Sequence, residues 1–248
     1  MSVLLLRLAG PMQSWGIQSR FSDRDTSLEP TKSGVIGLLF AALGVPRECN
    51  SVTVEGVTVS LQGVASMPFG VRVDREGVLL EDFQTAGGSR SSDSEEGSRY
   101  GVVKADGSPG KTVLSRRQYL ADAVFTAGFV GDFNILTILH AALRHPVWPL
   151  CLGRKAFVPG DSVWLADGLL RDVMDLETAF RVFPLNLAAS MPPAPVRMVL
   201  ETSDVTGEIR QDVPESFSVD SRSFAARRVT TRWLEPPGVR PLPSDSAE

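Results

Sequence analysis

Apolar and polar positions alternate in blocks through the first 44 residues of the chain. Residues 3–8 are apolar except for one arginine. Successive side chains of a strand point to opposite faces, so apolar residues would lie on both faces, which predicts a central strand covered at least partly on each. Gly10 and Pro11 end this strand, because proline has no N–H with which to continue a ladder. Residues 30–44 then predict a helix without a polar stripe, so we expect that helix to be buried on most sides.

Further apolar runs predict more strands and a second long helix. Strands are expected over residues 57–61, 64–73, 78–83, 123–129 and 147–152, with short ones near 196–200 and 229–233. The strand over 123–129 alternates and is expected to be half-buried, and Asp132 is expected to cap a helix that runs to about Arg144. Residues 86–110 are rich in glycine and serine, which predicts a mobile loop or the outer part of a long hairpin that orders against a partner.

The order of these elements predicts an α+β fold. Strand, helix, strands, helix and strand follow one another as in the split βαβ plan, in which two helices pack on one face of an antiparallel sheet. A chain of 248 residues is long enough for one large core, or for one domain with a smaller appended lobe. No apolar run approaches the roughly 20 residues that span a bilayer, and the two cysteines lack metal spacing. We therefore expect a cytoplasmic protein that has no membrane partner.

The distribution of charge changes what the net charge implies. A formal charge of -4 and a pI near 5.4 argue against a protein that coats nucleic acid by itself. Basic residues nevertheless gather in three segments, at 111–120, 154–155 and 221–234, without an acid among them. Such segments are commonly solvated faces, yet three of them can also line one groove in an otherwise acidic molecule.

Two connections near the N-terminus carry candidate binding groups. Gln13, Ser14 and Trp15 follow the first strand directly, so an amide, a hydroxyl and an indole are displayed on a turn, unless Trp15 is a core residue and Gln13 only shapes the turn. The second connection opens the apolar helix. Its candidate anion-binding residues, at a helix start where free N–H groups hold phosphate readily, are Thr31, Lys32, Ser33 and Gly34.

Binding is better supported than catalysis by the residues present. Both histidines lie together near the end of one predicted helix, without metal spacing, and no GxSxG motif occurs, so no cofactor, metal or catalytic residue is predicted. For RNA, arginines can pair with phosphates, while Trp15 and Tyr119 can stack on unpaired bases or equally belong to the core. The candidate phosphate-binding side chains are those of Arg116, Arg117, Arg154, Lys155, Arg227 and Arg228.

Five segments together resemble one protein family. They are RLAGPMQSWG at 7–16, PTKSGVIGLLFAALG at 30–44, RQYLADAVF at 117–125, LGRK at 152–155 and SFAARRV at 223–229. In this order, the segments are similar to the CasD subunits of type I-E CRISPR Cascade complexes. The first two are the most specific as a pair.

The resemblance implies a fold, a function and partners. It implies a repeat-associated (RAMP) protein whose ferredoxin-like, RRM-type domain spans residues 1–185, with a β-hairpin thumb at about 84–118. Residues 186–248 would then pack on the same core, with a frayed tail from about 236. Such subunits cap the 5′ handle of CRISPR RNA beside the backbone and large Cascade subunits, and target DNA within the complex is a further candidate partner. The matching segments supply the expected handle contacts, Gln13 to Trp15, Thr31 to Gly34, Arg116 to Tyr119, and Arg154 with Lys155.

Two other functions remain open at this level. A related type I-C subunit cuts repeat RNA with a histidine and a tyrosine, whereas the segment after the expected thumb offers Ser115, Arg116 and Arg117 without a histidine. We therefore expect binding without cleavage. One alternative is a metal-independent ribonuclease that uses Tyr119 with Lys111 or Lys155. The other is a scaffold protein whose basic segments contact only protein.

Overall fold

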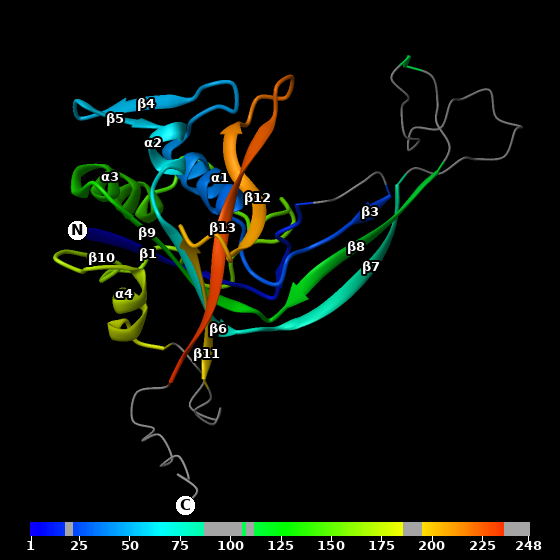
Figure 1. Ribbon diagram of the computed structural model, residues 1–248. Coiled ribbons are helices and arrows are strands. Elements are labelled where there is room, and N and C mark those ends of the chain that lie inside the picture. The colour runs from blue at the N-terminus through cyan, green and yellow to red at the C-terminus, as the bar shows by residue number, and fades with distance from the viewer. Residues whose placement is uncertain (18–21, 87–105, 108–111, 186–194, 236–248) are drawn as a thin grey trace, which may run out of the picture.

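Seven strands form one antiparallel sheet through the body of the protein (Figure 1). The computed structural model describes residues 1–17, 22–86, 106–107, 112–185 and 195–235. In spatial order the strands are β10 (Leu169–Leu170), β1 (Ser2–Ala9), β9 (Val124–Gly131), β6 (Phe69–Arg75), β11 (Val196–Thr202), β13 (Ser223–Leu234) and β12 (Glu208–Ser216). The C-terminal strands thus extend the same sheet that the N-terminal strands begin.

Helices cover both faces of this sheet. Helices α1 (Lys32–Leu43) and α3 (Phe133–Arg144) pack over the even-numbered residues of β1, and the short α2 (Leu61–Ala65) contacts α1. On the opposite face, α4 (Leu176–Val182) packs against Val3 and Leu5. A side chain at Gly128 would approach Leu176 to 2.7 Å, so a glycine at this position of β9 lets α4 lie close to the sheet. The expected two-sided cover of the first strand is confirmed.

The caps of α1 and α3 follow from the sequence as expected. Thr31 caps α1 through its side chain, and Gly44 ends the helix in the left-handed conformation with φ 71°. Asp132 caps α3 by accepting from the N–H groups of the two residues at 134 and 135. Helix α1 is buried on most sides because it packs on the sheet, including β12, and is flanked by α2 and α3.

A long hairpin projects from the body and forms the thumb of the molecule (Figure 1). Its strands are β7 (Val78–Ala86) and β8 (Val113–Ala121), so at its base the hairpin is longer than the predicted 84–118. Two short strands also pair with β8: β2 (Met12–Gln13) near that base and β3 (Asp23–Arg24) about midway along the strand. Most of the glycine- and serine-rich segment, the predicted tail from 236 and residues 186–194 lie outside the described residues.

Several predicted strands differ from the observed elements. Strand β5 (Val57–Ser60) pairs with β4 (Ser51–Val54) and ends one residue early, because the side chain of Ser60 accepts from Gly63 N at 3.0 Å and starts α2. Residues 147–152 form no strand, since the backbone N–H groups at 147 and 148 bond to the last carbonyls of α1. Strand β9 is buried on both faces, whereas the sequence predicted burial of one face. Strand β12 was not predicted, because the side chains that it turns inward are mostly polar. None of the described helices is long and apolar enough to span a membrane.

Candidate nucleic-acid interface

The turn after β1 is part of the core. The Gln13 amide donates to the carbonyls of Leu8 at 3.1 Å and Ala123 at 2.8 Å, and its oxygen accepts from the Trp15 indole at 3.2 Å. Trp15 is only 2% exposed and Gln13 is fully buried. The alternative in which both residues are structural is therefore correct, and the expectation that their side chains contact RNA is contradicted by their burial.

Ser14 joins three segments of the chain at this turn. Its hydroxyl is within 3.4 Å of the Asp25 carbonyl and 3.3 Å of the Gln118 carbonyl, and its N–H donates to Leu152 O at 3.1 Å. The loop after Leu152 packs so closely on this turn that a Cβ on Gly153 would lie 1.7 Å from the backbone carbonyl oxygen of Ser14. Ser14 is buried as well, so it positions the loop that carries Arg154 and Lys155 beside β8 instead of presenting its own hydroxyl.

The start of α1 is occupied by carboxylates of the protein itself. The N–H of Lys32 donates to Asp212 at 2.8 Å, and its ammonium group donates to Glu201 at 2.8 Å. Lys32 is 1% exposed, and burial lowers the pKa of its ammonium group, although Glu201 opposes that shift. Thr31 is also buried and accepts from the N–H of Gly34. The predicted phosphate site at this helix start is wrong for Thr31 and Lys32, because Asp212 takes the place of the anion.

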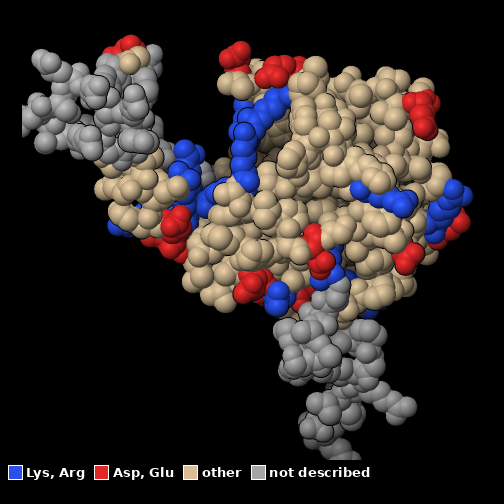
Figure 2. All heavy atoms as spheres, turned by 180° about the vertical axis from the view of Figure 1, so that it is seen from behind, with Lys and Arg blue, Asp and Glu red and all other residues tan. Residues whose placement is uncertain are grey.

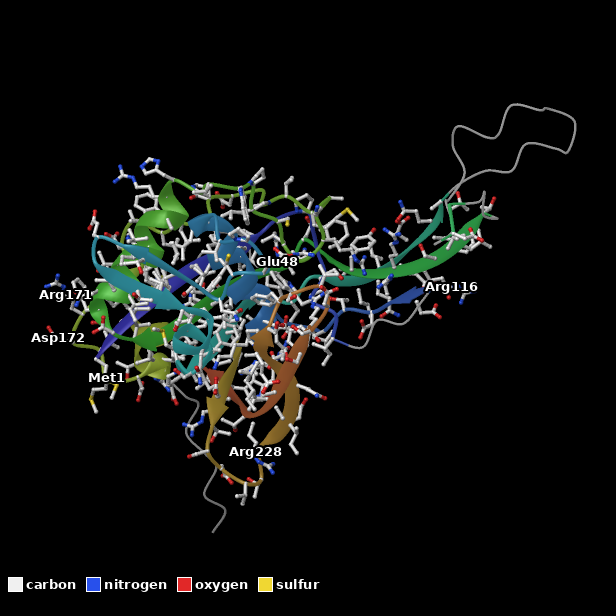
Figure 3. The ribbon with its side chains drawn as sticks, turned by 90° about the horizontal axis from the view of Figure 1, so that it is seen from above. Met1, Glu48, Arg116, Arg171, Asp172 and Arg228 are labelled. Atoms are coloured by element: carbon white, nitrogen blue, oxygen red, sulfur yellow. The ribbon has the colours of Figure 1, made fainter. Side chains whose placement is uncertain are left out.

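The two C-terminal arginines do not join the predicted groove. Arg227 is 8% exposed and donates to both carboxylate oxygens of Asp212, at 2.6 and 2.9 Å. Arg228 donates to the Gly207 carbonyl at 3.0 Å. Figure 3 shows Arg228 beside the loop that precedes β12, far from Arg116 on the thumb. Arg227 therefore stabilises the core, and Arg228 lies on a different surface from the thumb.

Three arginines gather about midway along the described part of the thumb, and we call Arg24, Arg117 and Arg154 the arginine cluster. Parallel pairing of β3 with β8 places Arg24 opposite Arg117. Arg154 donates to the Arg24 carbonyl at 3.1 Å. Burial first, and then the positive charges of Arg117 and Arg24, lower the pKa of the Arg154 guanidinium, while Asp25 and Asp82 oppose this effect. Because a guanidinium stays charged even so, the cluster concentrates positive charge at one place.

Aromatic side chains adjoin the arginine cluster. Tyr119 is half-buried and lies on the same face of β8 as Arg117, since residues two apart share a face of a strand. Its ring is 6.0 Å from that of Phe157, over which the Arg154 guanidinium lies at 5.4 Å. The Nη1 atom of Arg154 is buried and has no hydrogen-bond partner among the described residues. Arg116 is exposed on the opposite face of β8. Cationic donors beside an accessible ring suit a single-stranded nucleic acid.

A pocket of about 670 Å³ lies against the exposed side of α1, and we call it the α1 pocket. Of the predicted residues, Ser33, Gly34 and Lys155 line this pocket. Figure 2 shows Lys and Arg side chains gathered between the thumb and the body, along the edge of a hollow. Other residues that line the α1 pocket include Gly37, Arg47, Trp148, Phe217 and Arg222, of which only Arg222 lies in one of the three basic segments. Their order in the chain carries no motif, as they come from separate loops that only folding brings together.

The described residues hold no cluster of three or more His, Cys, Asp or Glu side chains that would suit a metal ion. Both histidines belong to the end of α3. A ring nitrogen of His140 is 2.7 Å from the Leu165 carbonyl, and His145 is exposed at the C-cap of the helix. Neither histidine adjoins the arginine cluster in the contacts that the structure records around Arg154.

Comparison with known proteins places these features in context. The family described as "CRISPR-associated protein (Cas_Cas5)" matches residues 3–230. The "CRISPR system Cascade subunit CasD" of Escherichia coli (strain K12) is 35% identical over 162 residues, which are 62% of this chain and 66% of that relative, just under two thirds of its length. A solved structure titled "CRISPR RNA-guided surveillance complex" contains a chain that is 34% identical with a TM-score of 0.72, over 95% of this chain and 91% of that one. Another, "Crystal structure of Cas protein", is 36% identical with a TM-score of 0.68, over 94% and 95%.

Proposed function

Because the chain belongs to the CRISPR-associated Cas5 family, we propose that it is a structural subunit of a type I-E Cascade surveillance complex and binds the 5′ handle of CRISPR RNA. The observation that carries this proposal is the arginine cluster, in which Arg24, Arg117 and Arg154 meet beside Tyr119. The three positively charged guanidinium groups repel one another, and a bound phosphate would stabilise them because its negative charge offsets that repulsion. The RNA-binding residues that the proposal assigns to this cluster are thus Arg24, Arg117, Tyr119 and Arg154.

The sheet topology supports a ferredoxin-like, RRM-type domain. The elements β1, α1, β6, β9, α3 and β10 follow the βαββαβ order along the chain, and their strands lie in the spatial order β10, β1, β9, β6. In the proposed domain, α1 and α3 cover one face of the sheet. The arginine cluster lies along β8 between the body and the outer part of the thumb, so the RNA handle would run along the side of the hairpin.

The exposed surface of the thumb supports a role for the protein within a complex rather than as a free monomer. Both of its strands expose apolar side chains, among them Leu79, Phe83 and Leu114, and such residues are expected to be covered in a complex. We expect the partners to be the CRISPR RNA and the backbone and large subunits of Cascade, with target DNA as a further candidate within the complex. Assembly would take place in the cytoplasm. The negative net charge fits this role, because affinity would come from one local surface.

Replacing Gly153 by alanine tests whether the loop holds Arg154 in place. An alanine there would put Cβ 1.7 Å from the Ser14 oxygen at a φ of +91°, so the loop must shift without any change of charge. We expect the affinity for handle RNA, measured by filter binding, to fall about tenfold, as for one lost charge-assisted contact. The matched control is Gly56→Ala, which has a similar φ of +80° and no neighbour within 4 Å, and which should bind RNA normally. Equal affinities of the two variants would show that the loop position is irrelevant.

Repeat RNA should remain uncut by this protein. Tyr119 packs against Phe157 beside the arginine cluster, Lys155 lines the α1 pocket, and Lys111 lies outside the described residues. No described histidine adjoins Tyr119 in a recorded contact to act as a general base. Incubation with repeat RNA in EDTA, followed on a denaturing gel, is expected to yield no discrete product. A single product that disappears in Tyr119→Phe would instead establish a ribonuclease.

A further inference from the structure

The α1 pocket combines cations with apolar surface and contains no carboxylate among its lining residues. Its cations come from three separate segments: Arg47 follows α1, Lys155 lies in the loop after Leu152, and Arg222 lies between β12 and β13. Lys155 and Arg47 both line the pocket together with Cys151, so their charges act on the same space. A ligand for this pocket must therefore be anionic and must also present an apolar or aromatic surface.

Helix α1 leaves room in the α1 pocket because the residue at position 37 is a glycine. Ser33, Gly37 and Ala41 are spaced four residues apart and share one side of α1. A Cβ added at Gly37 would meet only Phe217, at 3.8 Å, which is an ordinary contact. In contrast, a Cβ at Gly34 would press on Trp15 at 2.9 Å, so Gly34 serves the packing of the core. The room above Gly37 is thus available for a ligand between α1 and Phe217.

One wall of the α1 pocket is held in place before any ligand arrives. The backbone N–H of Trp148 donates to the Ala41 carbonyl at 3.2 Å, and that of Val147 donates to Ala42 at 2.9 Å. The same valine packs on Gly44, where a side chain would approach it to 2.7 Å. Trp148 nevertheless remains 40% exposed, unlike the buried Trp15. A large, accessible indole on a backbone held against α1 is a platform on which a flat ring can stack.

We propose that the α1 pocket binds one unstacked nucleotide of the RNA held at the arginine cluster, with its base on Trp148 and its phosphate among Arg47, Lys155 and Arg222. This inference rests on the proposed function, and it assigns a base-reading site to that function. Arg154 and Lys155 are consecutive, so their Cα atoms are about 3.8 Å apart, yet Arg154 belongs to the cluster and Lys155 to the pocket. A strand bound at the cluster therefore reaches the pocket with its next nucleotides. The volume of about 670 Å³ accommodates one nucleotide.

Removing single bases from the handle RNA tests this proposal in the full-length protein. We expect an abasic nucleotide at one position to weaken binding to the wild type about tenfold, as for the loss of one base–aromatic stack. Trp148→Ala should weaken binding of intact RNA by the same factor, and it should make the abasic substitution at that position silent. The control is Trp233→Ala, which removes an indole that is 61% exposed on β13 outside the pocket and should leave affinity unchanged.

Gly37→Leu fills the α1 pocket without removing any contact, and Gly37→Ala is its matched control. Both substitutions replace glycine inside a helix by a better helix former, so neither is expected to unfold the protein. The leucine variant should lose about tenfold in affinity for intact RNA, and its loss should also disappear with the abasic RNA. The alanine variant should bind nearly as well as the wild type.

The outcomes separate this inference from the proposed function. Normal binding by Trp148→Ala and Gly37→Leu, together with weak binding when Arg117 and Arg154 are changed, would overturn the nucleotide pocket and leave the function intact. Wild-type protein without affinity for handle RNA would overturn both. Unchanged RNA affinity with failed recruitment of a Cascade subunit in Trp148→Ala would show that the α1 pocket takes a protein segment, and it would overturn the proposal as well.

Discussion

Reversing the charges of Arg117 and Arg154 together should lower the affinity of the protein for handle RNA by about 100-fold or more. Each arginine is expected to make a charge-assisted contact with a phosphate, and such contacts contribute roughly 1.5–3 kcal/mol each. A glutamate at either position also repels the RNA backbone. Nη1 of Arg154 has no hydrogen-bond partner among the described residues, so one end of this guanidinium is not committed to an internal bond.

Equilibrium binding at several salt concentrations is the measurement for this variant. The slope of log affinity against log salt should become shallower by about 1–2 units, because fewer counterions are released on binding. Arg144→Glu combined with Arg171→Glu is the control, since it changes the net charge equally with two exposed arginines of α3 and the β10 region. Figure 3 shows Arg171 at the end of the body away from the thumb. An equal loss in both double variants would mean that only total charge matters.

Replacing Asp212 by alanine should destabilise the fold by about 3–5 kcal/mol, because the change leaves the Arg227 guanidinium buried without its carboxylate. Asp212 is 1% exposed, accepts from Arg227 at 2.6 and 2.9 Å, and also takes the N–H of Lys32 at the start of α1. The free energy of unfolding, measured in urea, is the appropriate quantity. Asp220→Ala is the control, because Asp220 is exposed between β12 and β13.

The Asp212→Ala variant also tests whether the N-terminus of α1 holds a carboxylate of the protein or a phosphate of the RNA. If Asp212 occupies this helix end as part of the fold, the folded fraction of Asp212→Ala should bind handle RNA with unchanged affinity. If a phosphate of the RNA belonged there, removal of the competing carboxylate would raise that affinity, since helix N-termini attract anions. Stronger RNA binding by Asp212→Ala would therefore contradict the internal role of this carboxylate.

Elements with strong local signals could be predicted from the sequence. Helices α1 and α3 have an apolar pattern together with a capping residue, Thr31 or Asp132, and local caps of this kind act independently of the remainder of the chain. The strand preference of residues 196–200 and 229–233 was also visible, although β13 begins at Ser223 and is much longer than expected. Strand β12 was missed because Asp212 and other polar residues face inward, where hydrophobic periodicity gives no signal.

The structure brings together only some of the candidate binding residues, whose role in RNA binding stays a prediction. Arginines of the thumb were named because the segment 111–120 is basic, and the structure places Arg117 and Arg154 close enough to interact electrostatically. Arg24 and Trp148 were missed, since neither lies in a basic or aromatic segment that stands out along the chain. The pairing of β3 with β8 brings Arg24 to Arg117, and backbone bonds to α1 hold the chain at Trp148 beside the α1 pocket.

The sequence by itself determined the family, the two capped helices, the central strand and the presence of a long hairpin, because these depend on local pattern and on motifs. The tertiary structure alone decided which cations face solvent. Lys32 and Arg227 look as available as Arg117 and Arg154 along the chain, yet the first two are neutralised by Asp212 and Glu201. The physical reason is that the environment of a charge is set by residues remote in sequence, such as Asp212, which lies 180 residues from Lys32.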